Sequence, residues 1–327
     1  MKKICLYLLI VLTVTACEKT LIPNIENTPT KVFEELWKYV DEHYIYFDTK
    51  QVDWDEVYSE YAPMINDQLT DIQLFEICAA MVAELKDGHN VLRRSTRSSN
   101  AYDFTIGYEV LFDPTIVREN YLNNEFEEAG EYTYGIIGGN IGYTHFKDFK
   151  PTGDIKTVIN FLEEQQVDGL IFDVRSNGGG GFAERIVKHF IDKTTTVGYT
   201  VEKAGKGHNE VTDNLSFVIQ PATPYFSKPV KVLTNRGSFS ATSYFAGKMK
   251  HLPNVTIIGQ ITGGGGGGNA AYQLPNGWNI SVSVSTFLDT EFEDIEGGVV
   301  PHIELNNDTD RLANGIDDIL ERALADF

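Results

Sequence analysis

The sequence predicts an α/β protein in which a helical N-terminal region leads into a core built on a largely parallel sheet. Helical periodicity covers residues 31–88, and from residue 154 onward helical and strand-like segments alternate along the chain. Strands that alternate with helices are typical of parallel sheets whose two faces are both covered. With 327 residues, of which 42% are hydrophobic, the chain is long enough to bury such a core.

The first residues are typical of an export signal. Lys2 and Lys3 precede an apolar run over residues 4–16, which is too short to cross a bilayer core of ~30 Å at ~1.5 Å per residue. The small residues before Cys17 resemble a bacterial lipobox, which implies cleavage before Cys17 and acylation of its thiol. We therefore expect a signal peptide at residues 1–16, a lipid-anchored tether at residues 17–30, and a periplasm-facing or surface-exposed location in the bacterial cell envelope. An ordinary signal peptide is the alternative.

Charge and cysteine content exclude several classes of protein. The formal net charge of −20 predicts a surface that repels nucleic acid and anionic lipid, so we expect no nucleic-acid partner and membrane contact only through the anchor. Cys5 lies in the signal and Cys17 would carry lipid, so Cys78 has no disulfide partner. Its helical surroundings favour a buried apolar role over a reactive thiol.

Residues 31–95 are interpreted as an N-terminal helical domain, a small bundle. Apolar side chains recur at helical intervals in residues 31–47, 52–65 and 69–88. Thr70 and Asp71 offer N-cap chemistry for the last of these helices, and Gly88 offers a stop.

Residues 96–327 are interpreted as the core domain. Its first half begins with strand-like runs at residues 104–112, 132–139 and 140–146. The alternating part then predicts helices at 154–166, 182–193 and 240–251 and strands at 168–174, 229–234 and 254–259. A strand at 279–288 and a helix at 314–327 complete the chain.

Two junctions between a strand and a helix could carry chemistry, since open α/β sheets bind ligands at such places. The glycines at 178–181 let the backbone turn sharply and present N–H groups suited to an anion or an oxyanion. Ser240 precedes a predicted helix, where the helix dipole favours a developing oxyanion. A serine in this position is more commonly an N-cap than a nucleophile.

The glycine run at 263–268 is a third junction. It lacks the Gly-Lys-Ser/Thr ending of a phosphate-binding loop, so we expect a flexible loop beside a cleft. Gly178, Gly180 and Ala183 also match a loose dinucleotide fingerprint, which leaves a dinucleotide-binding enzyme as a weaker alternative.

A nucleophilic serine needs a base. His89 follows a predicted helix at a plausible cleft edge, whereas His43 and His189 fall inside helical patterns where solvated or packed histidines are common. His145 is undecided on sequence grounds.

Taken together, six segments resemble the tail-specific or C-terminal processing serine peptidase family, and specifically its tricorn-core-like branch. They stand in the order of that family: LKDGHN, NIGYTHFKDF, DGLIFDVRSNGGG, VLTNRGSFSATSYFAGKMK, IIGQITGGG and IEGGVVPHIEL. The resemblance implies a Clp-protease/crotonase-like α/β spiral core. A PDZ domain, which many members carry, is not expected, because the stretch between residues 95 and 134 is at the lower limit of independent folding.

The resemblance also assigns roles. Ser240 matches the nucleophile, and Gly178 or Gly179 with the N–H of Ala241 would form the oxyanion hole. The place of the family's lysine base is occupied by Gly265, and the matching histidine of the tricorn branch is His89.

Glu296 resembles the supporting glutamate of that branch, although Glu291, Glu293 and Asp294 lie close by. Gly88 stands where the tricorn core has a serine, so a four-residue relay is not implied. Lys248 lies eight residues beyond Ser240, or ~12 Å along a helix, out of hydrogen-bond reach.

The expected function is therefore a lipid-anchored envelope serine peptidase that acts on peptides or proteins through an acyl-enzyme on Ser240. No metal or cofactor is expected, since the sequence shows no Cys/His cluster. The main alternative is a non-catalytic carrier on the same scaffold, because related retinoid-binding proteins share the superfamily. The oligomeric state and the substrate are left open.

Overall fold

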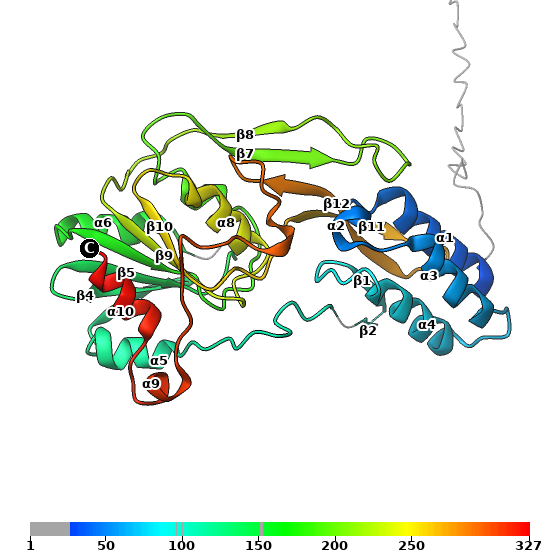
Figure 1. Cartoon of the computed structure of the whole chain (residues 1–327), viewed down its shortest axis with the longest axis horizontal. Coiled ribbons are helices and arrows are strands. Elements are labelled where there is room, and N and C mark those ends of the chain that lie inside the picture. The colour runs from blue at the N-terminus through cyan, green and yellow to red at the C-terminus, as the bar shows by residue number, and fades with distance from the viewer. Residues whose placement is uncertain (1–26, 96, 100, 151–152) are drawn as a thin grey trace, which may run out of the picture.

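A seven-stranded sheet forms the centre of the larger lobe in the computed structural model, which describes residues 27–95, 97–99, 101–150 and 153–327 (Figure 1). The strand order is β13-β10-β9-β6-β5-β4-β3; neighbours from β5 to β13 are parallel, and β4 and β3 continue the sheet antiparallel. This sheet confirms the predicted α/β core. The strands are β3 (Phe126–Ala129), β4 (Tyr132–Ile137), β5 (Ile141–Phe146), β6 (Gly169–Asp173), β9 (Val230–Thr234), β10 (Val255–Gly259) and β13 (Ile303–Glu304).

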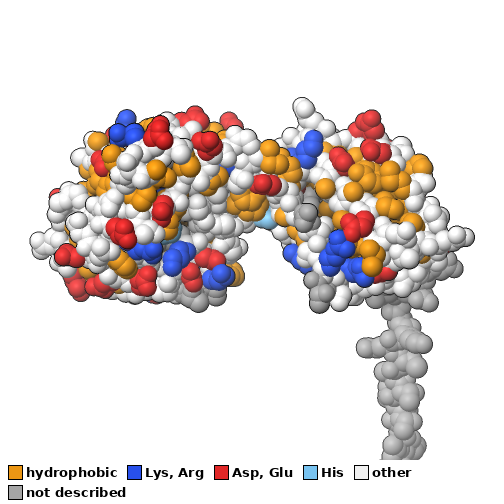
Figure 2. Space-filling view, turned by 90° about the horizontal axis from the view of Figure 1, so that it is seen from below, with side chains coloured by type: hydrophobic (Ala, Val, Ile, Leu, Met, Phe, Trp, Pro, Cys, Tyr) orange, Lys and Arg blue, Asp and Glu red, His pale blue; other side chains and the backbone are white. Residues whose placement is uncertain are grey.

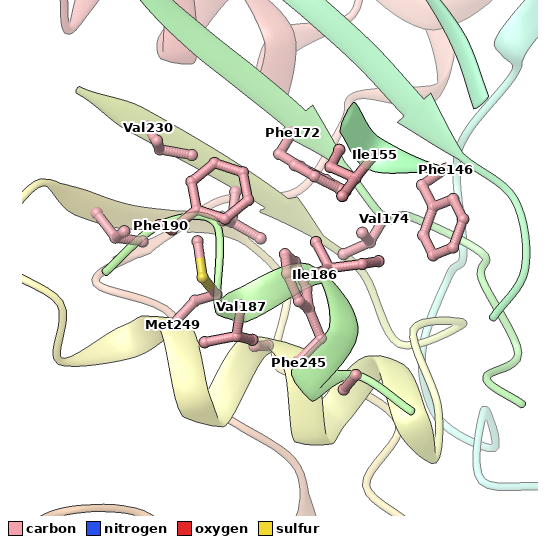
Figure 3. Close-up of a cluster of buried hydrophobic side chains, with 14 of the residues drawn as sticks. Phe146, Ile155, Phe172, Val174, Ile186, Val187, Phe190, Val230, Phe245 and Met249 are labelled. Atoms are coloured by element: carbon pink, nitrogen blue, oxygen red, sulfur yellow. The ribbon is translucent and has the colours of Figure 1, made fainter. Parts of the chain in front are cut away.

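Helices cover both faces of this sheet. In β6, Leu170 and Phe172 face one hydrophobic cluster and Ile171 faces another, as expected from the alternation of side chains along a strand. The first cluster lies under α6 (Ile155–Glu164), α7 (Glu184–Val187) and α8 (Ala241–Lys250), as Figure 3 shows for part of it. The second lies under η2 (Val117–Tyr121) and α10 (Asp318–Ala325).

The helix that follows Ser240 is held by this packing. Phe245 and Met249 of α8 lie one helical turn apart, are fully buried, and point into the cluster shown in Figure 3. Burying such a side chain contributes roughly 1.5–3 kcal/mol each. The N-terminus of α8 is thereby fixed against the ends of β6 and β9.

A second sheet connects the two lobes, which meet at a narrow waist (Figure 2). Its order is β2-β1-β12-β7-β8, and β11 pairs with the other edge of β12. The first half of β12 pairs with β1 and the last half pairs with β7, so this one strand runs from the smaller lobe to the larger one. The strands are β1 (Val91–Arg94), β2 (Arg97–Ser98), β7 (Thr195–Glu202), β8 (Leu215–Ile219), β11 (Gly267–Gln273) and β12 (Asn279–Leu288).

The N-terminal helices do not form a bundle by themselves, which corrects the sequence interpretation. They share one hydrophobic core with Leu274, Trp278, Ile280 and Val282, which come from the β11–β12 hairpin, about 190 to 250 residues later in the chain. Periodicity identified the apolar face of each helix but not the sheet that covers it. The helices are α1 (Pro29–His43), α2 (Phe47–Lys50), α3 (Trp54–Tyr61), η1 (Ala62–Met64) and α4 (Asp71–Ala83).

Local signals in this lobe were informative. Thr70 caps α4 in a capping box with Gln73, as its position predicts. The helix ends at Ala83, however, before the predicted stop at Gly88. Cys78 is fully buried, which confirms its predicted position in the core, and burial raises the pKa of its thiol to about 12.

Two further expectations for the core were wrong. The segment at residues 104–112 forms no strand; it crosses between the lobes with Phe104 stacked on Phe239 and the Glu109 carbonyl bonded to Gln260. The helix predicted at 182–193 is reduced to α7, because the Lys188 and His189 carbonyls accept hydrogen bonds from Ala222 and Phe226 rather than from a continuing helix. The remaining elements are α5 (Pro114–Ile116), η3 (Ile295–Gly297) and α9 (Thr309–Ala313).

Two expectations for the N-terminus concern residues outside the described ones, namely the signal peptide at 1–16 and the anchor at Cys17. None of the helices in the described part of the chain is both long enough and apolar enough to cross a membrane.

Candidate active site

Ser240 lies in the tight turn between β9 and α8, in a conformation that ordinary residues avoid. Its φ and ψ are 57° and −121°, and its own N–H is bonded to the Gly264 carbonyl at 2.9 Å. Backbone strain of this kind costs about 1–3 kcal/mol and occurs mainly where function requires it. Although Ser240 occupies the N-cap position, its side chain makes no capping hydrogen bond. The common structural explanation for a serine at this place therefore does not apply.

The Ser240 hydroxyl instead faces His89. The distance between Ser240 Oγ and His89 Nε2 is 2.9 Å, although the two residues are 151 positions apart. Ser240 belongs to the larger lobe, and His89 lies in the loop between α4 and β1 of the smaller lobe. The site is thus assembled where the two lobes meet.

The surroundings of His89 favour the neutral imidazole. Burial lowers the pKa of His89 below 6.5; the Lys50 ammonium also lowers it, whereas the Asp87 carboxylate opposes this change. With the ring hydrogen on Nδ1, Nε2 is free to accept the hydroxyl proton of Ser240. Nδ1 is buried and has no hydrogen-bond partner among the described residues.

The Glu296 carboxylate forms no hydrogen bond with the His89 ring among the described residues. One carboxylate oxygen pairs with Lys50 Nζ at 2.7 Å, and the other accepts the N–H of Gly266 at 2.9 Å. Burial, reinforced by the nearby Asp87 charge, raises the pKa of Glu296 to about 7. In this structure Glu296 holds the glycine run that packs against His89, and its supporting role in catalysis stays a prediction.

Asp87 is the carboxylate nearest to His89, and sequence reasoning did not select it. One oxygen accepts the backbone N–H of His89 at 2.8 Å, and the other accepts the Ser283 hydroxyl at 2.8 Å. The position of Asp87 two residues before the histidine, in LKDGHN, was an available signal for this turn. Lys50 in α2 carried no comparable signal.

The Phe239 ring leaves no room for a serine side chain at residue 88, directly before the histidine. A Cβ atom at Gly88 would lie 2.9 Å from the ring of Phe239, which in turn packs beside the His89 ring at a centroid distance of 5.0 Å. The aromatic ring occupies the space that a side chain at residue 88 would need.

Asp87 and Lys50 carry opposite charges near His89, so we expect their removal to shift the pKa of His89 in opposite directions. Asp87→Asn removes a charge that stabilises the imidazolium, so the pKa of His89 should fall further. Lys50→Met removes a charge that opposes the imidazolium, so the pKa should rise. NMR titration of the His89 ring measures both, with the exposed Lys86→Met as a matched control that leaves the pKa unchanged. Shifts of equal sign in the two variants would contradict this electrostatic account.

The glycine loop after β6 lies directly against the turn that holds Ser240. Gly179 and Gly180 have φ values of 97° and 138°, and a Cβ at Gly179 would lie 2.9 Å from the backbone nitrogen of Ala241. The Gly179 N–H donates to the Asn177 side chain at 2.9 Å and is therefore already engaged. Gly180, with Ala241, lines the cavity beside Ser240, whereas Gly178 does not. Gly180 is therefore a further candidate for an oxyanion donor, and the roles predicted for Gly178 and Gly179 stay predictions.

A buried ion network fixes the base of this loop. Arg175 pairs with Asp173 at 2.6 Å and with Asp317 of α10 at 2.8 Å, and all three side chains are fully buried. Removing one partner from such a network usually costs 3–5 kcal/mol, so the loop has a rigid support.

The other serines of this stretch are structural. The Ser238 hydroxyl donates to the Val174 carbonyl at 2.8 Å, and the Ser243 hydroxyl pairs with Thr262 Oγ1 at 2.9 Å. Both serines are fully buried.

The second glycine run packs into the site, and its last two glycines, Gly267 and Gly268, line the cavity beside Ser240, so its predicted place beside a cleft is confirmed. Gly266 contacts Glu296, and the Gly266 carbonyl accepts the Tyr244 hydroxyl at 2.7 Å. A Cβ at Gly265 would lie 2.7 Å from the Phe239 ring and 3.1 Å from His89 Cε1. A lysine therefore cannot be accommodated at residue 265 without moving the Phe239 ring, which packs beside His89.

A cavity of about 430 Å³ opens next to Ser240. Its walls combine aromatic rings, glycine backbone and two charged side chains. They comprise His89, Gly180, Gly181, Phe182, Ala183, Glu184, Phe217, Ser240, Ala241, Tyr244, Lys248, Gly267, Gly268 and Asn269. Within the described residues, no three His, Cys, Asp or Glu side chains are grouped so as to hold a metal ion.

The remaining histidines have other environments. The ring of His43 bonds to the Tyr39 carbonyl and that of His189 to the Pro224 carbonyl. His145 is buried beside Phe112, where burial lowers its pKa.

Solved structures show where this fold occurs. A protein of Parabacteroides merdae described as a "putative peptidase" is 35% identical, with a TM-score of 0.85 over 92% of this chain and 96% of that one. The photosystem II D1 C-terminal processing protease has a TM-score of 0.57 over 86% of this chain and 94% of that one, but at 17% identity it supports the fold alone. These similarities confirm the predicted fold class.

Curated relatives share part of the chain. The carboxyl-terminal-processing protease of Synechocystis is 28% identical over 169 residues, which are 50% of this chain and 38% of the relative. The carboxy-terminal processing protease CtpB of Bacillus subtilis is 28% identical over 157 residues, 47% of this chain and 31% of the relative. The matched part thus spans only about a third of the length of these relatives.

Family models match two separate stretches of the chain. Residues 25–83, which include the N-terminal helices, match the tricorn protease C1 domain. Residues 140–305, about half of the chain, match peptidase family S41 and include Ser240, the glycine loops and Glu296. The chain therefore belongs to peptidase family S41.

Proposed function

We propose that this protein is a serine peptidase that cleaves peptide bonds through an acyl-enzyme on Ser240. The observation that carries the proposal is the 2.9 Å contact between Ser240 Oγ and His89 Nε2, made by a serine in a strained turn at a helix N-terminus. A nucleophile and a base within hydrogen-bond distance are the core of this chemistry. Membership of family S41 supports the same conclusion.

In the proposed first half-reaction, Ser240 Oγ attacks the carbonyl carbon of the scissile peptide bond while His89 Nε2 accepts the hydroxyl proton. The carbonyl oxygen becomes an oxyanion, which the N–H groups of Ala241 and Gly180 stabilise at the positive end of α8. His89 then returns the proton to the leaving amine as the C–N bond breaks. The acyl group remains on Ser240.

In the second half-reaction, water attacks the ester carbonyl and His89 accepts one of its protons. The C–O bond to Ser240 breaks, the proton returns to Ser240 Oγ, and the new carboxylic acid leaves. Asp87 positions the histidine through the backbone, since its carboxylate holds the His89 N–H and the Ser283 hydroxyl together. Glu296 and Lys50 hold the glycine run that packs against the His89 ring.

Cleavage-site profiling tests this proposal. A peptide library incubated with the wild-type protein is expected to yield defined products, and the Ser240→Ala protein is expected to yield none. A folded wild-type protein that cleaves no member, but binds a ligand in the cavity beside Ser240, would favour the carrier alternative.

We further propose that the protein is a lipoprotein of the bacterial cell envelope, anchored through Cys17. The motif before Cys17 supports this proposal, as does the polar tether that follows it. Cys17→Ala is expected to move the protein from the membrane fraction to the soluble fraction, because a covalent lipid supplies the membrane affinity. Unchanged fractionation, together with an intact peptide from residues 1–16 in mass spectrometry, would contradict it.

A further inference from the structure

One face of α8 runs from the proposed nucleophile to a buried lysine. Ser240, Tyr244 and Lys248 recur every four residues and all three line the same cavity. Side chains on a helix lean toward its N-terminus, so Lys248 points back along the cavity toward Ser240. Lys248 is too far along the helix from Ser240 to act as its base. Its position in the cavity wall instead indicates a role in ligand binding.

The Lys248 ammonium lies in an aromatic environment without a counter-ion. Its Nζ is 4.0 Å from the ring centroid of Phe217 and 5.1 Å from those of Tyr244 and Phe287. Only 4% of the residue is exposed, and no carboxylate of the described residues forms an ion pair with it. Three rings partly compensate a buried cation, but they do not replace an anion.

Glu184 lines the same cavity, and it is the acid whose charge acts on Lys248. Its charge acts on Lys248 from beyond ion-pair distance, while burial, the larger effect, lowers the pKa of Lys248 to about 8. In its protonated form the lysine brings a positive charge to the wall of the cavity. The Lys248 ammonium is buried, has no ion-pair partner among the described residues and lines the same cavity as Ser240, so it can bind an anionic group of a ligand in this cavity.

We propose that Lys248 makes this cavity a binding site for a carboxylate of the peptide substrate. The proposal rests on the peptidase function proposed above. The carboxylate could come from an aspartate or glutamate side chain close to the scissile bond, or from the α-carboxylate at the C-terminus of the substrate. The apolar walls at Phe182 and Phe217 suit the methylene groups of a substrate side chain that ends in this carboxylate.

Matched peptides test the proposal. The first pair has glutamate or glutamine next to the scissile bond with an amidated C-terminus; the second pair has a free or an amidated C-terminus with glutamine in that position. A charge-assisted hydrogen bond predicts that kcat/KM is about 10- to 100-fold higher for the carboxylate member of one pair. The pair that shows the preference identifies the source of the carboxylate.

Variants then assign the preference to Lys248. Lys248→Met should reduce this ratio to near one, mainly through KM, and Lys248→Arg should retain part of it. Lys250→Met, on the same helix but outside the cavity, should leave the ratio unchanged. If Lys248→Met does not fold, Glu184→Gln provides a second arm, because removal of the competing charge should increase the ratio.

The outcomes separate this proposal from the peptidase proposal. Cleavage with ratios near one in both pairs, or ratios unaffected by Lys248→Met and Glu184→Gln, overturns the carboxylate site and leaves the peptidase function intact. Failure of the wild-type protein to cleave any of the peptides, or any member of the library, overturns both. Loss of all cleavage in folded Lys248→Met protein would also overturn the carboxylate site, because the lysine would then be required for the reaction itself.

Discussion

Ser240→Ala is expected to lower kcat/KM by about 10⁴- to 10⁶-fold on any peptide that the wild-type protein cleaves. The hydroxyl is the atom that forms the acyl-enzyme, and no neighbouring group can replace it. Stability should change little, because the side chain caps no helix and its hydrogen bond in the structure is to His89. Steady-state kinetics and thermal unfolding of the same preparation measure both effects.

Two neighbouring serines provide the controls. Ser238→Ala and Ser243→Ala each remove a buried structural hydrogen bond, so they should cost about 1 kcal/mol of unfolding free energy. Their activity should stay within about tenfold of the wild type, because neither hydroxyl reaches His89. An inactive but folded Ser243→Ala protein, alongside an active Ser240→Ala protein, would move the nucleophile to a different residue.

His89→Ala is the second change expected to be severe, with a loss of kcat/KM comparable to that of Ser240→Ala. The double variant should be little worse than either single one, because base and nucleophile act as a unit. The wild-type rate should rise with pH through an apparent pKa below 6.5, since burial lowers the pKa of His89 and only its neutral form can accept a proton.

Glu296→Gln is the matched comparison for this experiment. Its side chain bonds to Lys50 and Gly266 and forms no hydrogen bond with the His89 ring among the described residues, so the loss should be clearly smaller than for His89→Ala. Full activity in His89→Ala would refute the histidine mechanism. A loss in Glu296→Gln as large as in His89→Ala would show that the glutamate acts directly in the reaction.

Much of the core could be predicted because its signals are local. The segment Gly169–Asp173 has the continuous apolar composition of a strand covered on both faces, and each of its residues is buried. The turn before α8 was recognisable as a junction, and the resemblance to a family selected Ser240 and His89 as partners. The 2.9 Å contact between them agrees with that selection.

The errors arose where the deciding contacts are distant in sequence. The N-terminal helices need Trp278 and Ile280 to complete their core, and no pattern in residues 31–95 indicates this partner. The segment at 104–112 has strand-like composition, but stacking of Phe104 on Phe239 holds it as a crossing loop. The ion pair between Lys50 and Glu296 likewise forms only because segments far apart in sequence pack together.

Labelling with a fluorophosphonate tests the central claim most directly, because the reagent reacts only with an activated hydroxyl. Trypsin releases residues 237–248 as one peptide that contains all three serines, so fragment ions must locate the added mass. The account predicts label on Ser240 in the wild-type protein and none in folded His89→Ala protein. Label on Ser238 or Ser243, or an unlabelled wild-type protein that is folded, would contradict it.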